Sequence, residues 1–153
     1  MSQSLQAPLL TQEGRRRLAE RLRRLRDETL PELTAALDQS AQDPAVQADL
    51  DLASREVGRL AHLLKSAGSI TEIPEDPDVV QLGDWVTVRT DEGETNRYLI
   101  VHPAEAAVDR QRISADSPLA VAALDRRVGD LVEIDAPGGR YRCRIVEVLR
   151  ADA

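Results

Sequence analysis

The strongest constraint in this sequence is a run of apolar side chains that recurs alternately every four and every three residues. The run comprises Val46, Leu50, Ala53, Val57, Leu60, Leu64 and Ala67. This period of 3.5 residues is typical of one side of a coiled coil, because it keeps an apolar stripe facing a partner helix. The pattern predicts a long helix that packs along a second helix.

A matching apolar run precedes it and indicates the partner helix. Its members are Leu18, Leu22, Leu25 and Thr29, followed after a shift of frame by Leu30, Leu33 and Leu37. Proline removes one backbone hydrogen bond and crowds the preceding turn, so we attribute the shift of frame to a kink at Pro31. Two helices with complementary stripes predict an antiparallel coiled-coil hairpin over residues 10–70.

The predicted ends of these helices rest on capping residues. Thr11 is expected to cap the first helix, which runs to about Gln42, and Gly68 to end the second. Between the two helices, Asp43 can accept a hydrogen bond at the start of the second helix, while Pro44 fills its first position. Residues 1–9 are too polar and short to predict structure and are expected to be disordered.

The charges of the predicted hairpin are unevenly distributed. Arginines crowd its open end, opposed locally by Glu20; they are Arg15, Arg16, Arg17, Arg21, Arg23, Arg24 and Arg26. The closed end, residues 38–51, holds only acidic charges: Asp38, Asp43, Asp49 and Asp51. Such runs are usually solvated helix faces. The functional alternative is an acidic tip that enters a positively charged or metal-containing cleft.

After residue 78 the apolar period changes from 3.5 to 2, which predicts strands. We expect one strand pair within residues 85–101 and a second within 131–148, turned at Pro137-Gly138-Gly139, with a strand near Ile113. A short helix is expected over residues 118–127. The acidic, proline-rich residues 71–78 predict a linker, so the fold class is α+β, with a small antiparallel β domain at 79–150.

Composition excludes several classes of function. The chain has 153 residues and a net charge of −7, which argues against a general nucleic-acid binder. Its single cysteine, Cys143, alternates with arginines and is expected to fill a core position. His62 and His102 have no ligand-spaced companions, so we predict no catalytic residues, no metal site and no cofactor of its own. No signal or membrane-spanning segment is recognisable, and we expect a monomeric cytoplasmic protein.

Taken together, residues 10–14, 30–33 and 113–119 resemble the Gre family of bacterial transcript-cleavage factors. The resemblance runs from Leu10 onward and includes residues 10–14 and 30–33 in the hairpin. Its most specific part is Ile113-Ser114-Ala115-Asp116-Ser117-Pro118-Leu119, followed by residues 128–134 and by the turn at 137–139. The resemblance implies a coiled-coil hairpin followed by an FKBP-like domain.

The family resemblance also implies a partner and a way of binding it. The globular domain is expected to dock beside the secondary channel of bacterial RNA polymerase, and the hairpin to reach down the channel toward the polymerase magnesium. The docking loop is then Asp116, Ser117 and Pro118, with Leu119 beneath it. The simpler reading is that serine and proline only begin a helix, and the two roles are compatible.

The closed end departs from the family pattern. Cleaving members resemble one another in a Gly-Asp-x-x-Glu-Asn motif, whose two carboxylates help hold a second magnesium ion. This chain reads Ala41-Gln42-Asp43-Pro44-Ala45-Val46-Gln47-Ala48-Asp49, with no Asp and Glu at that spacing. The departure predicts that Asp43 and Asp49, supported by Asp38 and Asp51, approach the polymerase magnesium without building a cleavage site.

Three functions follow as hypotheses. The first is a regulator that binds RNA polymerase through the secondary channel without stimulating cleavage, as an inhibitor or a competitor of cleaving factors. In it, Arg16, Arg17, Arg23 and Arg24 would contact polymerase or nascent RNA. The second is a true cleavage factor with unconventional acids. The third is an interaction module like the regulators of nucleoside diphosphate kinase, against which the long hairpin counts.

Overall fold

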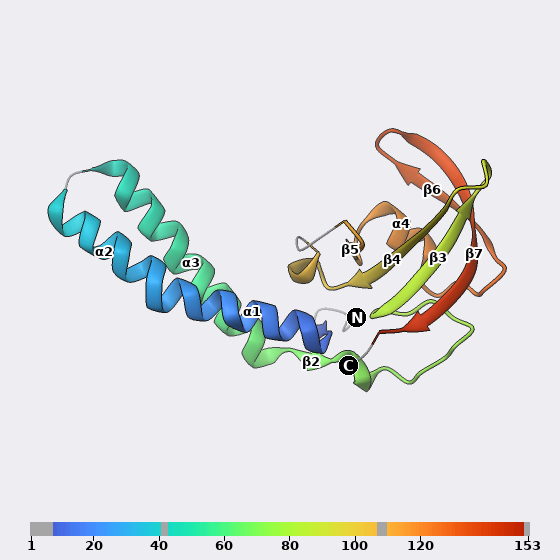
Figure 1. Cartoon of the computed structure of the whole chain (residues 1–153), viewed down its shortest axis with the longest axis horizontal. Helices are drawn as coiled ribbons and strands as arrows, with labels where there is room; N and C mark the ends of the chain where they lie inside the picture. Colours follow the sequence, from blue (N-terminus) through green and yellow to red (C-terminus); the bar gives the residue numbers. More distant parts are fainter. Residues whose placement is uncertain (1–7, 41–42, 107–109, 152–153) are drawn as a thin grey trace, which may run out of the picture. The chain divides into compact units, whose positions relative to one another are not determined.

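The computed structural model describes residues 8–40, 43–106 and 110–151, and the chain divides into two compact units. One unit contains Glu13–Ala67, and the other combines Leu9–Gln12 with the chain from Gly68 onward. Figure 1 shows a pair of long helices in the first unit and a curled sheet with a short helix in the second. The predicted α+β class, a helical hairpin followed by a small β domain, is confirmed.

The helical unit is a hairpin of two antiparallel arms. The first arm consists of α1 (Gln12–Arg24), the π-helical turn η2 (Leu25–Thr29) and α2 (Leu30–Gln39), and the second arm is α3 (Pro44–Ser66). The start of the first arm and the end of the second meet at the open end, where Arg15 Nη2 donates to the Ala67 carbonyl at 2.7 Å. At 1.5 Å per residue the first arm is about 42 Å long.

The buried side chains of the hairpin lie on the predicted stripes. Leu18, Leu22 and Leu25 are buried on the first arm, and Ala53 and Leu60 on the second. The other stripe residues of both arms are half-buried, and α2 contains no buried residue. The packing between the arms is therefore tightest from the open end to the middle and looser toward the closed end.

The shift of frame in the first arm lies earlier than predicted. A kink at Pro31 was expected, but the helix widens over Leu25–Thr29, where the Leu30 N–H bonds to the Leu25 carbonyl five residues back. A π-turn holds one extra residue and so moves the apolar stripe by one position. Pro31 follows directly in the first turn of α2, where its ring crowds the carbonyl of Asp27 and disfavours regular α-helical bonding.

The ends of the arms follow capping chemistry. Asp43 accepts a hydrogen bond from the Ala45 N–H at 2.9 Å, and Pro44 occupies the first helical position, as predicted. The first arm ends at Gln39 and not near Gln42, because Ser40 already leaves helical geometry with φ −139°. Residues 41–42 lie outside the described part of the chain.

The second unit is built on a five-stranded sheet in the order β5-β4-β3-β7-β6. Its strands are β3 (Asp84–Thr90), β4 (Thr95–Val101), β5 (Arg112–Ser114), β6 (Leu131–Ala136) and β7 (Gly139–Arg150). Both predicted hairpins are present, and β3 also pairs with β7. The sheet is mixed where an antiparallel one was predicted, because the edge strand β5 lies parallel to β4.

The main core lies between one face of the sheet and α4 (Pro118–Ala123). Cys143 is fully buried in this core, as predicted, beside residues such as Val86, Ile134 and Ala120. The helix is shorter than the predicted 118–127. It stops because Asp125 takes a left-handed conformation, φ 68°, from which its N–H bonds to the Val80 carbonyl at 2.9 Å.

Two short strands pair a segment that precedes the hairpin in the sequence with a segment that follows it. β1 (Leu9–Leu10) pairs in parallel with β2 (Gly68–Ser69), and the turn η3 (Ile70–Glu72) follows. A Cβ at Gly68 would meet the Glu72 carboxylate, so a larger residue here would require the Glu72 side chain to move. Leu9, within the segment expected to be disordered, thus belongs to a strand; residues 1–7 lie outside the described part.

Candidate functional site

The four predicted tip acids are all exposed. They are Asp38 on α2, Asp43 before α3, and Asp49 and Asp51 on α3. Two of them have local partners: Asp43 caps α3, and Asp51 accepts a hydrogen bond from Gln47 Nε2 at 3.0 Å. The closed end of the hairpin is therefore an acidic surface whose side chains partly serve the helix itself.

Two of these acids, Asp49 and Asp51, project from different sides of their helix. At about 100° per residue, Asp49 and Asp51 point to nearly opposite sides of α3. Within the described ranges, no group of three or more His, Cys, Asp or Glu side chains could hold a metal ion. Two-metal chemistry requires converging carboxylates, and Asp49 and Asp51 do not converge on one side of α3.

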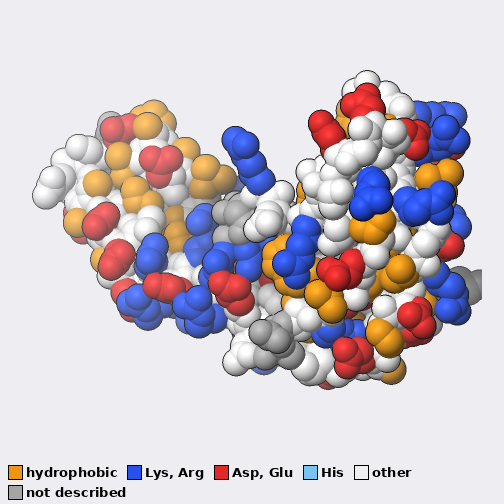
Figure 2. All heavy atoms as spheres, turned by 45° about the vertical axis from the view of Figure 1, so that its right-hand side comes forward, with side chains coloured by type: hydrophobic (Ala, Val, Ile, Leu, Met, Phe, Trp, Pro, Cys, Tyr) orange, Lys and Arg blue, Asp and Glu red, His pale blue; other side chains and the backbone are white. Residues whose placement is uncertain are grey.

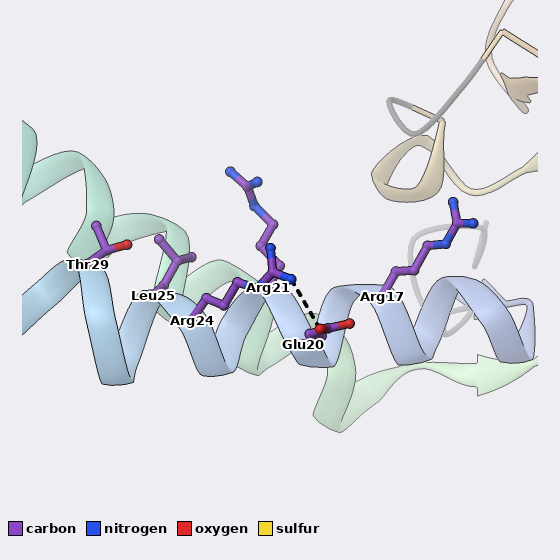
Figure 3. A pocket seen from close by; sticks show the side chains of 6 residues that line it. All are labelled: Arg17, Glu20, Arg21, Arg24, Leu25 and Thr29. Atoms are coloured by element: carbon purple, nitrogen blue, oxygen red, sulfur yellow. Dashed lines mark hydrogen bonds and ion pairs between the residues drawn. The ribbon is translucent and has the colours of Figure 1, made fainter.

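Basic and acidic side chains separate along the hairpin. On this unit, Figure 2 shows acidic and apolar side chains at the closed end and basic ones nearer the open end. A groove of about 430 Å³ runs along the basic part, lined by Arg17, Glu20, Arg21, Arg24, Leu25 and Thr29. Figure 3 shows Arg24 turned toward Glu20, with Nη2 and Oε1 3.2 Å apart.

The arginines near the open end of the hairpin, here called the basic root, are more fully paired than the sequence indicated. They are Arg15, Arg16, Arg17, Arg21, Arg23, Arg24 and Arg26. Glu20 was the expected local acid, but Glu13 lies 2.6 Å from Arg17 and 3.9 Å from Arg16. Glu56, from the other arm, accepts from Arg21 Nε at 2.5 Å. Arg23 is exposed and makes no ion pair with any residue that the structure describes.

The bond between the two arms affects the ionisation of its partners. The hydrogen bond from Arg21 lowers the pKa of Glu56 below its ordinary value, and the same bond raises the pKa of Arg21. Both effects favour the charged pair. This ion pair joins α1 to α3.

The predicted docking loop leads from β5 into α4. Ser117 caps α4, accepting from the Ala120 N–H at 3.4 Å, and Pro118 fills the first helical position. The Asp116 carboxylate accepts from the Ser114 hydroxyl, which fixes the turn. Asp116 and Pro118 are exposed, whereas Leu119 is half-buried and packs against the core. The loop thus presents a carboxylate and a proline ring on a fixed support.

One exposed apolar residue beside this loop was not singled out from the sequence. Val121 lies in the same short helix and is 65% exposed, while Ala120 and Ala123 point into the core. The helical period could have indicated it, because Val121 lies off the side of the helix that Ala120 and Ala123 share. Docking loop and Val121 together form an exposed surface with both polar and apolar character.

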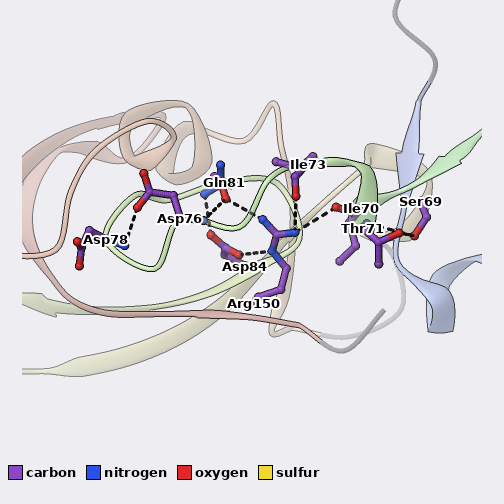
Figure 4. A network of polar contacts seen from close by, with 9 residues as sticks. All are labelled: Ser69, Ile70, Thr71, Ile73, Asp76, Asp78, Gln81, Asp84 and Arg150. Carbon is purple, nitrogen blue, oxygen red and sulfur yellow. Dashed lines mark hydrogen bonds and ion pairs between the residues drawn. The ribbon is translucent and has the colours of Figure 1, made fainter.

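Arg150 fixes the segment that was predicted to be a linker. Its guanidinium donates to the Ile70 and Ile73 carbonyls and to Asp84 Oδ1, each at 3.1 Å, and to Gln81 Oε1 at 2.7 Å (Figure 4). Asp84 is buried, and this burial raises its pKa although Gln81 N–H and Arg150 act against the rise. Nothing in the local sequence pattern of residue 150 indicated this role.

A second buried carboxylate holds the N-terminal segment. Glu105, only 1% exposed, accepts hydrogen bonds from the Thr11 N–H at 2.9 Å and from the Thr11 hydroxyl at 2.5 Å. Thr11, expected as a helix cap, thus directs its hydroxyl to a residue 94 positions away. Both carboxylates position the chain and do not form part of a described ligand site.

Comparison with known proteins agrees with this architecture. Residues 74–150 match the family model described as transcription elongation factor GreA/GreB, C-terminal. The chain is 36% identical to transcription elongation factor GreA of Thermotoga neapolitana, covering 91% of this chain and 95% of the relative. It is 33% identical to GreB of Pseudomonas aeruginosa, covering 92% and 89%.

A similar solved structure is that of GreA factor homolog 1 (Gfh1) of Thermus thermophilus, with 31% identity, 94% and 99% of the two chains covered and a TM-score of 0.43. From the sequence matches, the chain belongs to the GreA/GreB family of transcription elongation factors. The family predicted from the motifs is confirmed, and it is a family of accessory factors, not of enzymes. No helix in the described ranges is long and apolar enough to cross a membrane.

Proposed function

We propose that this protein binds bacterial RNA polymerase and regulates transcription through the secondary channel without stimulating transcript cleavage. It acts there as an inhibitor or as a competitor of cleaving Gre factors. The observation that carries this proposal is the closed end of the hairpin, which exposes carboxylates but lacks the Gly-Asp-x-x-Glu-Asn motif of cleaving members. The hairpin brings negative charge toward the polymerase magnesium and supplies no paired ligands for a second ion.

The hydrogen bonding of the Asp43 carboxylate supports this proposal. Its carboxylate accepts from the Ala45 N–H, and Pro44 directly follows in the helix. A carboxylate that caps a helix stabilises the N-terminal turn and is drawn away from a shared metal site. Asp38 on α2 and Asp49 further along α3 are the exposed acids that remain for an electrostatic effect on the polymerase metal.

The surface formed by Asp116, Ser117, Pro118 and Val121 is proposed to dock on polymerase. Its charge and its exposed apolar side chain suit an interface that combines a polar contact with a small apolar one. Capping of α4 by Ser117 keeps the loop in one conformation, so docking requires little ordering on binding.

The basic root is proposed to contact polymerase or the phosphates of nascent RNA. Arg23 is exposed and has no ion pair with the described residues, so it is the arginine most available for such a contact. Arg16, Arg17 and Arg24 are exposed or half-buried, and their acidic neighbours lie on the same helix.

The decisive experiment adds the purified protein to backtracked elongation complexes with labelled RNA. We expect slower nucleotide addition and no release of a 3′ RNA fragment. Asp49→Asn should weaken the inhibition. Asp43→Asn removes the charge of residue 43 and keeps the helix cap, because asparagine caps a helix as well as aspartate does. Any effect of this variant therefore comes from the lost charge. Asp78→Asn, an exposed acid in the other unit, is the matched control and should leave the effect unchanged.

A cleavage factor with unconventional acids is the second candidate, favoured by one observation. The tip still exposes acidic side chains, and the relatives named above are transcription elongation factors GreA and GreB. Release of a 3′ fragment that disappears in Asp49→Asn would establish this function and overturn the first proposal.

A further inference from the structure

The outer face of the sheet carries a row of arginines. Val86, Val88, Cys143 and Ile145 point into the core, so the residues that alternate with them face outward. Three outward arginines come from three neighbouring strands: Arg97 on β4, Arg89 on β3 and Arg144 on β7. All three are exposed. We refer to them as the arginine row.

The register places two of these arginines directly opposite one another. Arg89 is the cross-strand partner of Arg144, and Arg97 is paired with Thr87, one outward position along β3 from Arg89. Like charges directly opposite each other disfavour strand pairing. An anion bound near such a pair would offset this repulsion.

The arginine row is less well neutralised than its neighbours. Arg140 lies 3.8 Å from Glu133 and 3.7 Å from Asp135, and Arg142 lies 3.5 Å from Asp91. Arg89, in contrast, makes no ion pair with any residue in the described ranges. Arg144 donates to the Gly129 carbonyl, and Arg97 stacks over Trp85 at 4.5 Å. One acid, Glu147, faces outward opposite Thr87.

We propose that the arginine row binds the phosphate backbone of a nucleic acid, which goes beyond the proposed function. Neighbouring strands are about 4.8 Å apart, so the backbones that carry the three arginines span roughly 10 Å, a length comparable to that of about three phosphates along one duplex strand. Guanidinium groups bind phosphate oxygens in a bidentate manner, and the Thr87 and Thr95 hydroxyls between them add donors.

The nature of this face favours nucleic acid over an acidic protein. Stable protein interfaces are built around buried aromatic or aliphatic anchors. The centre of the arginine row holds Thr87 and charged side chains, and its one aromatic ring, Trp85, is already covered by Arg97. The exposed Leu131 and Leu149 lie at the margins of the row and not at its centre. Recognition is therefore electrostatic and independent of base sequence, since the row offers contacts to phosphate and not to base edges.

The test measures the salt dependence of binding between the full chain and a labelled DNA duplex by fluorescence anisotropy. Each lost phosphate contact lowers the slope of log affinity against log salt by about 0.9. The double variant Arg89→Gln/Arg144→Gln should therefore lower the slope by about 1.8 and weaken binding at least tenfold at low salt. Arg140→Gln, whose charge is already balanced, is the matched control and should change the slope by less than about 0.5.

Two results would overturn the proposal. One is an unchanged slope in the double variant that retains the wild-type circular dichroism spectrum and melting temperature, which would assign any binding to the basic root of the hairpin. The other is competition by poly-glutamate as effective as that by DNA at equal charge, which would identify the row as a site for acidic protein segments. Binding by Arg23→Gln that keeps the wild-type slope would support the arginine row.

Discussion

Glu105 and Asp84 are almost completely buried carboxylates, at 1% and 2% exposure, and each fixes a stretch of chain that is remote in sequence. Glu105 binds Thr11, and Asp84 binds Arg150. A buried carboxylate is stable only when hydrogen-bonded, so each partner is required by the other. No sequence pattern indicates such pairs, because their members are 94 and 66 positions apart and belong to no local period.

Replacing Glu105 by alanine is expected to destabilise the protein. The Thr11 N–H and hydroxyl would stay buried without their acceptor, which costs about 1–3 kcal/mol. Urea denaturation followed by circular dichroism measures the loss. Glu92→Ala, in an exposed turn, is the control and should change the free energy of unfolding by less than about 0.5 kcal/mol. Equal effects of the two substitutions would show that the Thr11–Glu105 contact contributes nothing.

At the scale of elements, the features that depend on local periodicity are those that the sequence predicted. The stripe from Val46 to Ala67 and the alternation around Cys143 each follow from one helix or strand having one buried side. The π-turn at Leu25–Thr29 and the parallel pairing of β5 were missed, since both depend on how neighbouring elements meet. The proposed docking loop rests on a family motif and not on periodicity.

The packed interface between the two arms, here called the seam, gives a prediction whose control lies on the same helix. Leu60 is 5% exposed and Leu52, on the same helix, is 63% exposed. Leu60→Ala should lower the free energy of unfolding by about 2–3 kcal/mol through lost burial and a cavity. Leu52→Ala should change it by about 0.5 kcal/mol or less. Thermal melts monitored at 222 nm, a helix-sensitive wavelength, separate the two; similar losses would contradict the assigned seam.

The Arg21–Glu56 pair predicts a pH dependence of hairpin stability. Because the folded pKa of Glu56 is lowered, the stabilisation is present above the unfolded pKa of about 4.3 and is lost as the pH falls through the folded pKa. The pair lies at the surface, with Arg21 exposed and Glu56 half-buried, so Glu56→Gln should cost only about 0.2–1 kcal/mol at pH 7.

The difference between wild type and Glu56→Gln should shrink as the pH is lowered from about 7 to about 3. Urea denaturation at several pH values measures it, and Glu20→Gln, in the i,i+4 pair with Arg24, serves as the comparison. A difference that grows toward acid pH would contradict the assigned direction of the pKa shift.

At the scale of the whole molecule, the proposed function divides the work between the two units. The sheet unit offers the docking surface, and the hairpin offers the acidic tip. Each part alone is an ordinary structural element, a capped helix start or a charged helix end. Their functional meaning comes from their presence in one chain of the GreA/GreB family, which periodicity and composition could not have indicated.

Reversing one charge on the docking surface should abolish the effect on transcription while the protein stays folded. Asp116 is exposed, so Asp116→Arg is expected to weaken polymerase binding at least tenfold with little change in melting temperature. Binding is measured by biolayer interferometry with immobilised polymerase. Asp78→Arg carries the same charge change in the same unit and should bind normally; equal weakening by both would indicate a general electrostatic effect.

The pairing of β1 with β2 makes the hairpin an insertion within a discontinuous domain, because Leu9–Gln12 and the chain from Gly68 onward form one unit. Joining residues so distant in the chain carries an entropy cost that grows with the length of the intervening loop. The antiparallel arms reduce this cost by returning the chain to its starting point, where Arg15 meets the Ala67 carbonyl. A helical hairpin of another length could therefore replace this one, provided that the distance between its two ends is the same.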